Sequence, residues 1–451
     1  MRLLSKRKSN MSEKITVIGA GLAGCEAAWQ LAKAGFQVDL WEMKPVKFTP
    51  AHKYQGFAEL VCSNSLKASR VNSAAGLLKE EMRRLGSLTV PCAEETKVPA
   101  GGALAVDREK FSDLVTEKIK SEPNITVKCG EITEIPDGNV IIATGPLTAG
   151  GLAESIEKLC GGYLSFHDAA APIVTYESLD KDRIFFAARY GKGDDDYINC
   201  PFTKEEYTEF WNELKNAESA PLHEFDTQKP KGNDDFTVYE GCMPIEVLAK
   251  RGEETMRYGA MKPVGLYDPV TNRRPYAVVQ LRKENSGGTL YNIVGFQTNL
   301  KFGEQKRVFS MIPGLANAEF VRYGVMHRNS FINSPKVLDG DFSLRVRSNL
   351  FFAGQITGVE GYMESAASGI MAGLNMARRL QGKDTIILPQ ETMIGALARY
   401  ISDETVENFQ PMGANMGILP EIGVRIKDKQ ERYQVIADRA LEAFEGYMKE
   451  V

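Results

Sequence analysis

Two cysteines stand in contexts where a thiol could act as a nucleophile. Cys62 follows the strand-like run FAELV and precedes a small polar Ser-Asn-Ser stretch. Cys242 follows the strand-like FTVYEG and precedes Pro244, which can open a helix. A helix N-terminus lowers the pKa of a neighbouring thiol, and the thiolate is the nucleophilic form. A free cysteine is more often a small buried hydrophobic residue, so from these contexts alone both interpretations stay open.

The other cysteines point away from disulfide and metal chemistry. The chain has 7 cysteines, an odd number, and none forms a CxxC pair. A disulfide framework and a zinc site are therefore both disfavoured. We expect Cys25, Cys92, Cys129 and Cys160 to be buried packing residues, while Cys200 in NCPF is ambiguous. This pattern predicts a reduced, cytoplasmic protein without a bound metal.

A glycine-rich turn near the N-terminus predicts a dinucleotide site. The strand-like ITVIG runs into GxGxxG, after which alanines and leucines repeat at helical spacing as far as Gly35. The glycines permit a tight turn and close approach of a pyrophosphate, and the helix N-terminus offers free N–H groups to it. A second strand, QVDLWE, ends on Glu42, which is placed to accept hydrogen bonds from an adenosine ribose. The predicted nucleotide-binding residues are Gly19, Ala20, Gly21, Leu22, Ala23, Gly24 and Glu42.

Two later segments favour FAD over NAD as the bound nucleotide. Residues 139–152, NVIIATGPLTAGGL, resemble the strand-plus-ATG segment of two-dinucleotide-type flavoproteins. Residues 348–380 resemble their final FAD motif, a strand, AG, a Gly-rich loop and a helix, with Gly354, Gln355 and Tyr362 as candidate contacts. Many such flavoproteins have Asp where this chain has Gln355, so only amide hydrogen bonding remains there. No second GxGxxG marks a nicotinamide domain, so a nicotinamide reductant would bind transiently.

These segments predict the domain organisation. We expect a Rossmann-like α/β FAD-binding domain built from both chain ends, residues 11–165 and 335–451, with an inserted α+β domain at residues 166–334. Residues 1–10 are expected to be an extension without fold content. Within the insertion, residues 203–217 predict a capped amphipathic helix. The chain has no apolar run long enough to span a bilayer and no signal-peptide core.

Charge is distributed unevenly along the insertion. The net charge of the chain is −4, which does not by itself indicate nucleic-acid binding. Residues 166–235 carry 8 Lys and Arg against 16 Asp and Glu, whereas residues 236–336 carry 14 against 8. The basic segment suits a local polyanion-binding face, although a solvated surface is the commoner meaning of scattered charge.

Five blocks together resemble a family of flavin-dependent RNA-modifying enzymes. They are GAGLAGCEAAWQLAKAG, FAELVCSNSL, YEGCMPIEVLA, RYGVMHRNSFINSP and FAGQITGVEGYMESAASG, and they extend over nearly the whole chain beyond Met11. Together they are similar to the bacterial folate- and FAD-dependent tRNA (uracil-5-)-methyltransferases, the TrmFO family. The resemblance implies methylation of the T-loop uridine of tRNA at C5, with carbon from methylenetetrahydrofolate. It also implies that NADH or NADPH supplies reducing equivalents through FAD.

The same resemblance implies roles for particular residues. Cys242 matches the nucleophile that would add to uracil C6, and Cys62 a thiol close to the flavin, although the division of labour between them stays open. His327 would cover the folate pterin, Arg328 would hold its acidic tail, and Tyr362 would lie beside the flavin. The expected tRNA phosphate contacts are Lys250, Arg251, Arg273, Arg274, Arg282 and Lys283.

Three alternative functions remain on sequence grounds. Flavoproteins that modify wobble uridine in tRNA share the FAD segments, but we would not expect the YEGCMPIE block in them. A small-molecule flavin oxidoreductase would use the same FAD motifs without needing a basic surface or a C6 nucleophile. A non-catalytic, FAD-stabilised RNA-binding module would use both cysteines only for packing.

Overall fold

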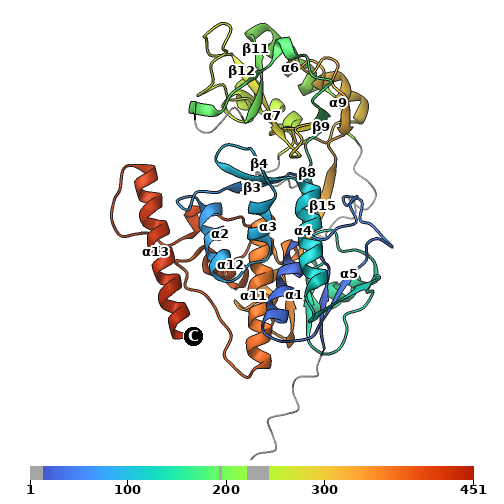
Figure 1. Cartoon of the computed structure of the whole chain (residues 1–451), viewed down its shortest axis with the longest axis vertical. Helices are drawn as coiled ribbons and strands as arrows, with labels where there is room; N and C mark the ends of the chain where they lie inside the picture. The colour runs from blue at the N-terminus through green and yellow to red at the C-terminus, as the bar shows by residue number, and fades with distance from the viewer. Residues whose placement is uncertain (1–13, 192–195, 221–242) are drawn as a thin grey trace, which may run out of the picture.

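The chain folds into two parts joined by a ribbon. The computed structural model describes residues 14–191, 196–220 and 243–451. The larger part fills the lower half of Figure 1, and the smaller part, between β9 (Ile173–Thr175) and β14 (Phe320–Arg322), lies above it. Residues 1–10, expected to be an extension, and Cys242 lie outside the described residues.

A six-stranded sheet forms the centre of the larger part. Its strand order is β16-β17-β7-β1-β2-β6, parallel except for the edge strand β16. The strands are β1 (Ile15–Ile18), β2 (Val38–Glu42), β6 (Ile125–Cys129), β7 (Val140–Ile142), β16 (Ser343–Leu344) and β17 (Arg347–Phe352). Ile141 lies opposite both Val17 and Phe351, so segments from the two ends of the chain share one sheet. This confirms the predicted Rossmann-like α/β fold.

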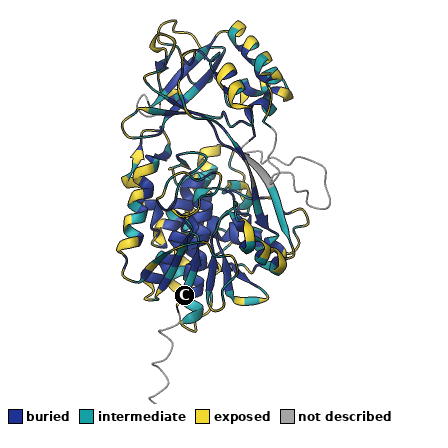
Figure 2. Ribbon diagram, turned by 90° about the vertical axis from the view of Figure 1, so that its right-hand side faces the viewer, coloured by how far each residue is buried: buried dark blue, intermediate teal, exposed yellow. Residues whose placement is uncertain are grey.

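Two helices pack closely over this sheet. The backbones of α1 (Leu22–Lys33) and α11 (Tyr362–Leu380) are in close contact, because a Cβ on Gly369 would lie 2.1 Å from the Ala23 carbonyl oxygen. The small residues predicted to allow close approach in residues 348–380 therefore do so. Figure 2 shows this centre as a buried block. The other helices of this part are α2 (Ala74–Arg84), α3 (Thr89–Glu95), α4 (Arg108–Ser121), α5 (Gly150–Cys160), α10 (Ser334–Val337), α12 (Met393–Ser402) and α13 (Lys429–Glu450).

The smaller part has its own antiparallel sheet and core. The strand order is β10-β11-β12-β13-β9-β14, with β10 (Phe185–Phe186), β11 (Tyr197–Phe202), β12 (Ala277–Lys283) and β13 (Leu290–Ile293). Its helices are α6 (Lys204–Asn216), α7 (Ile245–Arg251), α8 (Glu253–Tyr258) and α9 (Phe302–Phe309). Val279, Phe296 and Phe309 are fully buried between sheet and helices. The capped helix predicted at 203–217 is α6, where Thr203 and Glu206 form a capping box.

A two-stranded ribbon connects the parts. β8 (Tyr163–Ala169) pairs antiparallel with β15 (Met326–Ile332), and the predicted boundary at residue 166 falls inside β8. A small sheet, β3 (Ser65–Ala68), β5 (Ala103–Val106) and β4 (Lys97–Val98), lies on the side of the larger part that faces the smaller one (Figure 1). Within the described ranges, no helix is long and apolar enough to cross a membrane.

Candidate active site

The N-terminus of α1 forms a cradle for a pyrophosphate. Gly21 is the N-cap and provides no capping side chain, and a Cβ on it would meet nothing within 4 Å. Gly19 has φ +98°, and a Cβ there would lie 2.6 Å from the Ala143 carbonyl oxygen, so only glycine fits the turn. Gly24 is equally restricted, because a Cβ would lie 1.7 Å from the Gly19 carbonyl oxygen. The uncapped N–H groups and the open space beside them fit the pyrophosphate of FAD.

Glu42 sits at the end of β2, as predicted, but its carboxylate also holds the local backbone. One oxygen accepts from the Ala20 N–H at 2.9 Å and the other from the Lys44 N–H at 3.0 Å. The side chain is buried, with 8% of the residue exposed. Each oxygen keeps a second lone pair, so the carboxylate can still accept a bond from a ribose hydroxyl.

The loop between β17 and α11 closes the other side of the cradle. Gly354 has φ +86°, and its N–H donates to Ser368 Oγ at 2.7 Å. Gln355, which stands where many related flavoproteins have Asp, donates from Nε2 to Glu360 Oε2 at 2.5 Å. The Gln355 side chain therefore orders the loop through Glu360.

Cys62 lies beside the N-terminus of α11, where it is hydrogen-bonded to Tyr362. The Cys62 sulfur is 3.0 Å from the Tyr362 hydroxyl oxygen, which also accepts from the backbone N–H groups of Cys62 at 2.8 Å and Ser63 at 3.3 Å. Burial, and then the negative charge of Cys62, raises the pKa of Tyr362 well above its ordinary value. Two N–H groups donate to the Tyr362 hydroxyl oxygen, so the hydroxyl proton of the neutral tyrosine is free to be donated to the Cys62 sulfur. Cys62 is therefore a half-buried thiol with a tyrosine hydroxyl at hydrogen-bond distance from its sulfur.

Comparison with known proteins decides the family. Two curated relatives are named methylenetetrahydrofolate--tRNA-(uracil-5-)-methyltransferase TrmFO. The one from Acetivibrio thermocellus is 58% identical over 97% of this chain and 99% of its own length, and the one from Enterococcus faecalis is 58% identical over 96% and 98%. The family model described as glucose inhibited division protein A matches residues 14–384. The chain belongs to the TrmFO family.

Solved structures show the same fold for more distant proteins. Aquifex aeolicus GidA superposes with a TM-score of 0.67 at 16% identity, over 97% of this chain and 74% of that one. At that identity the likeness concerns the fold alone. It confirms the two-dinucleotide-type architecture predicted from the glycine motifs.

In this TrmFO family member, a network of hydrogen bonds ties the Cys62 loop to the smaller part. Arg108 donates to the carbonyl oxygens of Leu60 and Val61, at 2.7 and 3.3 Å, and its Nε pairs with Glu284 at 2.6 Å. Burial by itself lowers the pKa of Arg108, but the charge and hydrogen bond of Glu284, together with Tyr362 and Cys62, outweigh it and the pKa is raised. Asn64 donates to the Lys283 carbonyl oxygen at 2.8 Å. We name this the interpart network: Asn64, Arg108, Arg282 and Glu284.

The sequence motifs did not reveal this network. Asn64 and Arg108 stand on the larger part, and Arg282 and Glu284 follow more than 170 positions later along the chain. Only the fold brings them together. The alternation in β12, where residues 277–283 read AVVQLRK, puts Arg282 on the face of Val278 and Gln280, opposite the core residues Ala277, Val279 and Leu281, so the strand pattern gave no signal that Arg282 is buried.

Arg282 corrects one prediction. It was expected to contact tRNA phosphates, but the residue is 7% exposed, with Nε donating to Asn64 Oδ1 at 3.0 Å and Nη2 to Ser63 Oγ at 2.9 Å. A guanidinium held in this way is not on the surface that tRNA meets. Lys283 is only partly exposed, and its backbone carbonyl belongs to the interpart network.

The other expected tRNA contacts lie at the surface. Lys250 and Arg251 end α7 and are exposed, and Arg273 and Arg274 are exposed in the loop before β12. Arg274 lies over the ring of Tyr267, 5.9 Å from its centroid. These four residues therefore stay predictions for phosphate contact.

Three expected residues cannot be placed against the site. Cys242 lies outside the described residues. His327 and Arg328 belong to β15, where their backbone pairs with Asp168 and His167 of β8. Their roles toward uracil and folate stay predictions from the family resemblance.

Most of the expected packing cysteines are buried. Cys25, Cys92 and Cys160 are buried as predicted, and burial raises the pKa of Cys92 and of Cys160 to about 12, which keeps both thiols protonated. Cys200, which was ambiguous, is fully buried. The prediction for Cys129 was wrong: it is exposed, because it ends β6 at the edge of the sheet.

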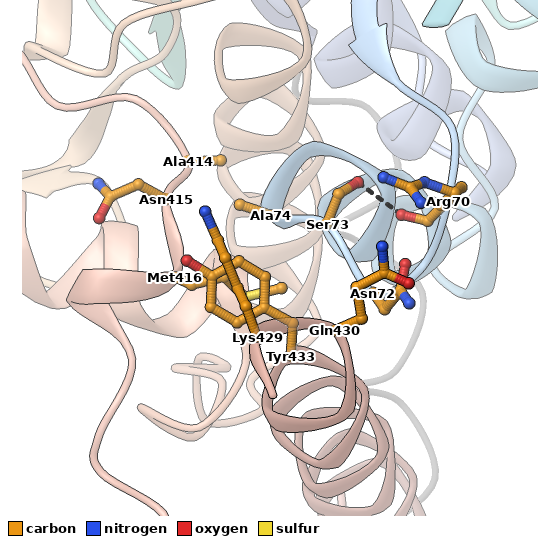
Figure 3. Close-up of a pocket in the computed structure, with 10 residues that line it drawn as sticks. All are labelled: Arg70, Asn72, Ser73, Ala74, Ala414, Asn415, Met416, Lys429, Gln430 and Tyr433. Atoms are coloured by element: carbon orange, nitrogen blue, oxygen red, sulfur yellow. Dashed lines mark hydrogen bonds between the residues drawn. The ribbon is translucent and has the colours of Figure 1, made fainter. Parts of the chain in front are cut away.

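A cavity lies apart from the predicted site residues. A space of about 510 Å³ lies between the start of α2, the loop at 414–416 and the start of α13 (Figure 3). Its lining residues are Arg70, Asn72, Ser73, Ala74, Ala414, Asn415, Met416, Lys429, Gln430 and Tyr433. It touches the α11 terminus only indirectly, since the Ala414 N–H donates to Glu364 Oε1 at 2.9 Å. None of the predicted site residues lines it.

Proposed function

We propose that this chain methylates C5 of the T-loop uridine of tRNA, with methylenetetrahydrofolate as carbon donor and NADH or NADPH as reductant. The observation that carries the proposal is the near full-length similarity to proteins named for this reaction, 58% over 97% of the chain. The Cys62–Tyr362 pair at the FAD cradle supports it, because the chemistry needs a poised thiol at the flavin end of the site.

The chain's own groups have definable tasks in this reaction. Thiolate addition to C6 makes C5 of uracil nucleophilic, so that C5 can attack the one-carbon unit. Loss of the C5 proton then expels the carrier nitrogen and leaves a methylene group on C5, and hydride addition to this methylene with departure of the thiolate restores the ring. We assign the addition to Cys242. Cys62, with Tyr362 as its hydrogen-bond donor, faces the carbon-transfer end of the site. When bound and reduced by NADH or NADPH, FAD would supply the hydride that completes the methyl group.

The target base must leave its stack to reach such a site. RNA bases in loops can be splayed out and bound on aromatic or cationic side chains, which suits a T-loop uridine. Lys250, Arg251, Arg273 and Arg274 would hold the phosphates around it. A small-molecule oxidoreductase would have no use for these groups.

Incubation with an unmodified tRNA transcript, methylenetetrahydrofolate and NADPH tests the proposal. We expect 5-methyluridine in the T-loop, detected by nucleoside mass spectrometry, and none when any one component is omitted. Cys242→Ala should abolish product while the protein stays yellow, and Cys129→Ala, at an exposed thiol, should leave product formation unchanged. NADPH oxidation without modified tRNA would instead identify an oxidoreductase, and a wobble-uridine product would identify the related RNA-modifying class.

A further inference from the structure

A stack of three aromatic rings ends at the surface of the smaller part. The ring centroids of Phe320 and Tyr323 are 5.3 Å apart with planes inclined by 8°, and those of Tyr323 and Phe302 are 5.0 Å apart at 17°. Phe302 is the outer ring, and 56% of the residue is exposed. Two rings behind it hold its plane fixed. An exposed ring held in this way is a preformed surface for another planar group.

The outer ring borders a small cavity that carries two cations. Its volume is about 160 Å³, and its walls come from both parts of the molecule. The lining residues are Pro50, Ala51, Lys53, Phe302, Val321, Arg322, Tyr323 and Val325. Among the described residues, no carboxylate pairs with the Lys53 ammonium or the Arg322 guanidinium. The nearby Glu304 is already paired, since it accepts from Arg307 at 2.8 and 2.9 Å.

One cation of this cavity, Arg322, lies within electrostatic range of Cys62. Burial and the neighbouring charge of Arg108 lower the pKa of Arg322, while Tyr362 and Cys62 oppose that shift. Arg322 therefore shares its electrostatic surroundings with the Cys62–Tyr362 pair. A charged group bound at Arg322 would lie in the same electrostatic surroundings as Cys62.

We propose that Phe302, Lys53 and Arg322 form a subsite for one unstacked nucleotide of the tRNA, next to the uridine that is methylated. The base would stack on Phe302, and its phosphate would lie between Lys53 and Arg322. The inference rests on the proposed function and specifies how the RNA is held. Every base has a flat face, so an aromatic platform with adjoining cations suits a single-stranded nucleotide whatever its identity.

The cations and the exposure favour a nucleotide over the folate. Lys53, Phe302 and Val321 are exposed at the rim, where a macromolecule can reach them. An RNA backbone also carries a charge at every nucleotide, which suits a small cavity lined by two cations. Folate offers a ring and an acidic tail as well, so the experiment must separate the two ligands.

The first experiment measures tRNA affinity by fluorescence anisotropy with an unmodified transcript. Phe302→Ala and Phe302→Leu should each raise Kd by about tenfold, and Phe302→Trp should bind like the parent chain, because only the flat ring matters. The matched control is Phe186→Ala, which removes another exposed phenylalanine of the smaller part, 42% exposed, away from this cavity. Lys53→Ala should lower the slope of log Kd against log salt by about one unit.

The second experiment locates the stacked base. Transcripts that each lack one T-loop base are bound to the parent chain and to Phe302→Ala. At one position, removal of the base should weaken binding to the parent chain about tenfold and should not weaken binding to the variant further.

Three results would overturn the subsite. They are an unchanged tRNA Kd in Phe302→Leu, additive losses at every abasic position, or a raised KM for folate with tRNA affinity intact. The proposed function is judged separately, by whether the parent chain forms 5-methyluridine. If the parent chain methylates tRNA and Phe302→Leu binds tRNA normally, the proposed subsite is wrong and the proposed function stands.

Discussion

We expect the Tyr362 hydroxyl to control how readily Cys62 ionises. A hydrogen bond donated to sulfur stabilises the thiolate over the thiol, and the neutral tyrosine is the donor within reach, 3.0 Å away. The Arg108 guanidinium adds positive potential from the other side of the loop. The hydrogen-bond partner of the Cys62 sulfur is therefore a residue 300 positions away in sequence.

Removing that hydroxyl gives a prediction for Cys62 alone. In Tyr362→Phe, we expect alkylation of Cys62 by iodoacetamide at neutral pH to slow about tenfold, because one hydrogen bond to a charged group contributes about 1.5–3 kcal/mol. The rate is read by peptide mass spectrometry, since the exposed Cys129 also reacts. The pH profile of alkylation should move upward.

Tyr163→Phe is the matched control for this substitution. Its hydroxyl donates to the Ala153 carbonyl oxygen at 3.2 Å, away from Cys62, so the alkylation profile should not move. An equal shift in both variants, or none in Tyr362→Phe, would show that the hydroxyl does not govern the thiol.

At this scale the sequence indicated Cys62 as a candidate but not the residues that contact it. FAELVCSNSL marks Cys62 as a thiol leaving a strand-like run, which local context can show. Tyr362 was predicted beside the flavin, yet its bond to Cys62 depends on how the start of α11 meets the residue 60–64 loop. Arg282 shows the opposite failure: a charge in a basic segment was assigned to the surface, whereas β12 turns it inward against Asn64.

Among the secondary-structure elements, the contact between α1 and α11 positions the cradle. Gly369→Ala would place a methyl group 2.1 Å from the Ala23 carbonyl oxygen, a backbone atom that cannot swing away. Overpacking of this kind costs about 1–3 kcal/mol and moves the start of α1. We expect a lower apparent melting temperature and loss of FAD on gel filtration, followed by the ratio of flavin to protein absorbance.

Gly446→Ala provides the comparison within the same chain. Gly446 lies in α13, and a Cβ there meets nothing within 4 Å. Alanine should be neutral or stabilising there by up to about 1 kcal/mol, since it lowers the entropy of the unfolded chain. Similar loss of FAD in both variants would mean that helix packing is not the cause.

The start of α12 depends on a buried carboxylate, which predicts a pH dependence. Glu81 accepts from the N–H groups of Met393 at 2.7 Å and Ile394 at 2.8 Å. Burial raises the pKa of Glu81 from 4.5 to about 8, outweighing those bonds. Between these values the folded chain keeps a proton that the unfolded chain releases, so the contribution of Glu81 to stability falls as pH rises.

Glu81→Gln isolates that contribution. Glutamine does not titrate, so the apparent melting temperature of the parent chain, relative to the variant, should decline steadily from pH 5 to pH 8. Thermal unfolding followed by circular dichroism across this range measures it. A difference that stays constant with pH would contradict the assigned titration.

Helices and strands that have a local sequence pattern could be predicted, but their pairing with distant segments of the chain could not. β1, α1 and β2 follow from apolar periodicity and the glycine turn, and the α6 capping box is legible at Thr203 and Glu206. The ribbon of β8 and β15 pairs segments more than 150 residues apart, which no local pattern encodes. The boundary drawn at residue 166 therefore cut a strand.

For the molecule as a whole, the interpart network decides how the two cores sit together. Each part has its own buried core, and the Arg108–Glu284 pair joins them with side-chain exposures of 16% and 3%. A buried pair is weak evidence for net stability, because both charges lose hydration. Its effect is to hold one docking arrangement, in which Arg108 also binds the carbonyls before Cys62.

Breaking one side of this pair should separate the parts. In Glu284→Ala the Arg108 charge stays buried without its carboxylate, at a cost of about 3–5 kcal/mol, and the apparent melting temperature should fall by at least about 5 °C. Glu218→Ala is the control: it removes an exposed pair with Lys301 on the same part and should leave melting unchanged.

A double substitution separates stability from the position of the thiol. Arg108→Met combined with Glu284→Leu should recover most of the melting temperature, because neither charge remains to be buried. It should not recover the alkylation rate of Cys62, since the Leu60 and Val61 carbonyls lose their donor. If the double variant restores both, the network only holds the parts together and does not position the thiol.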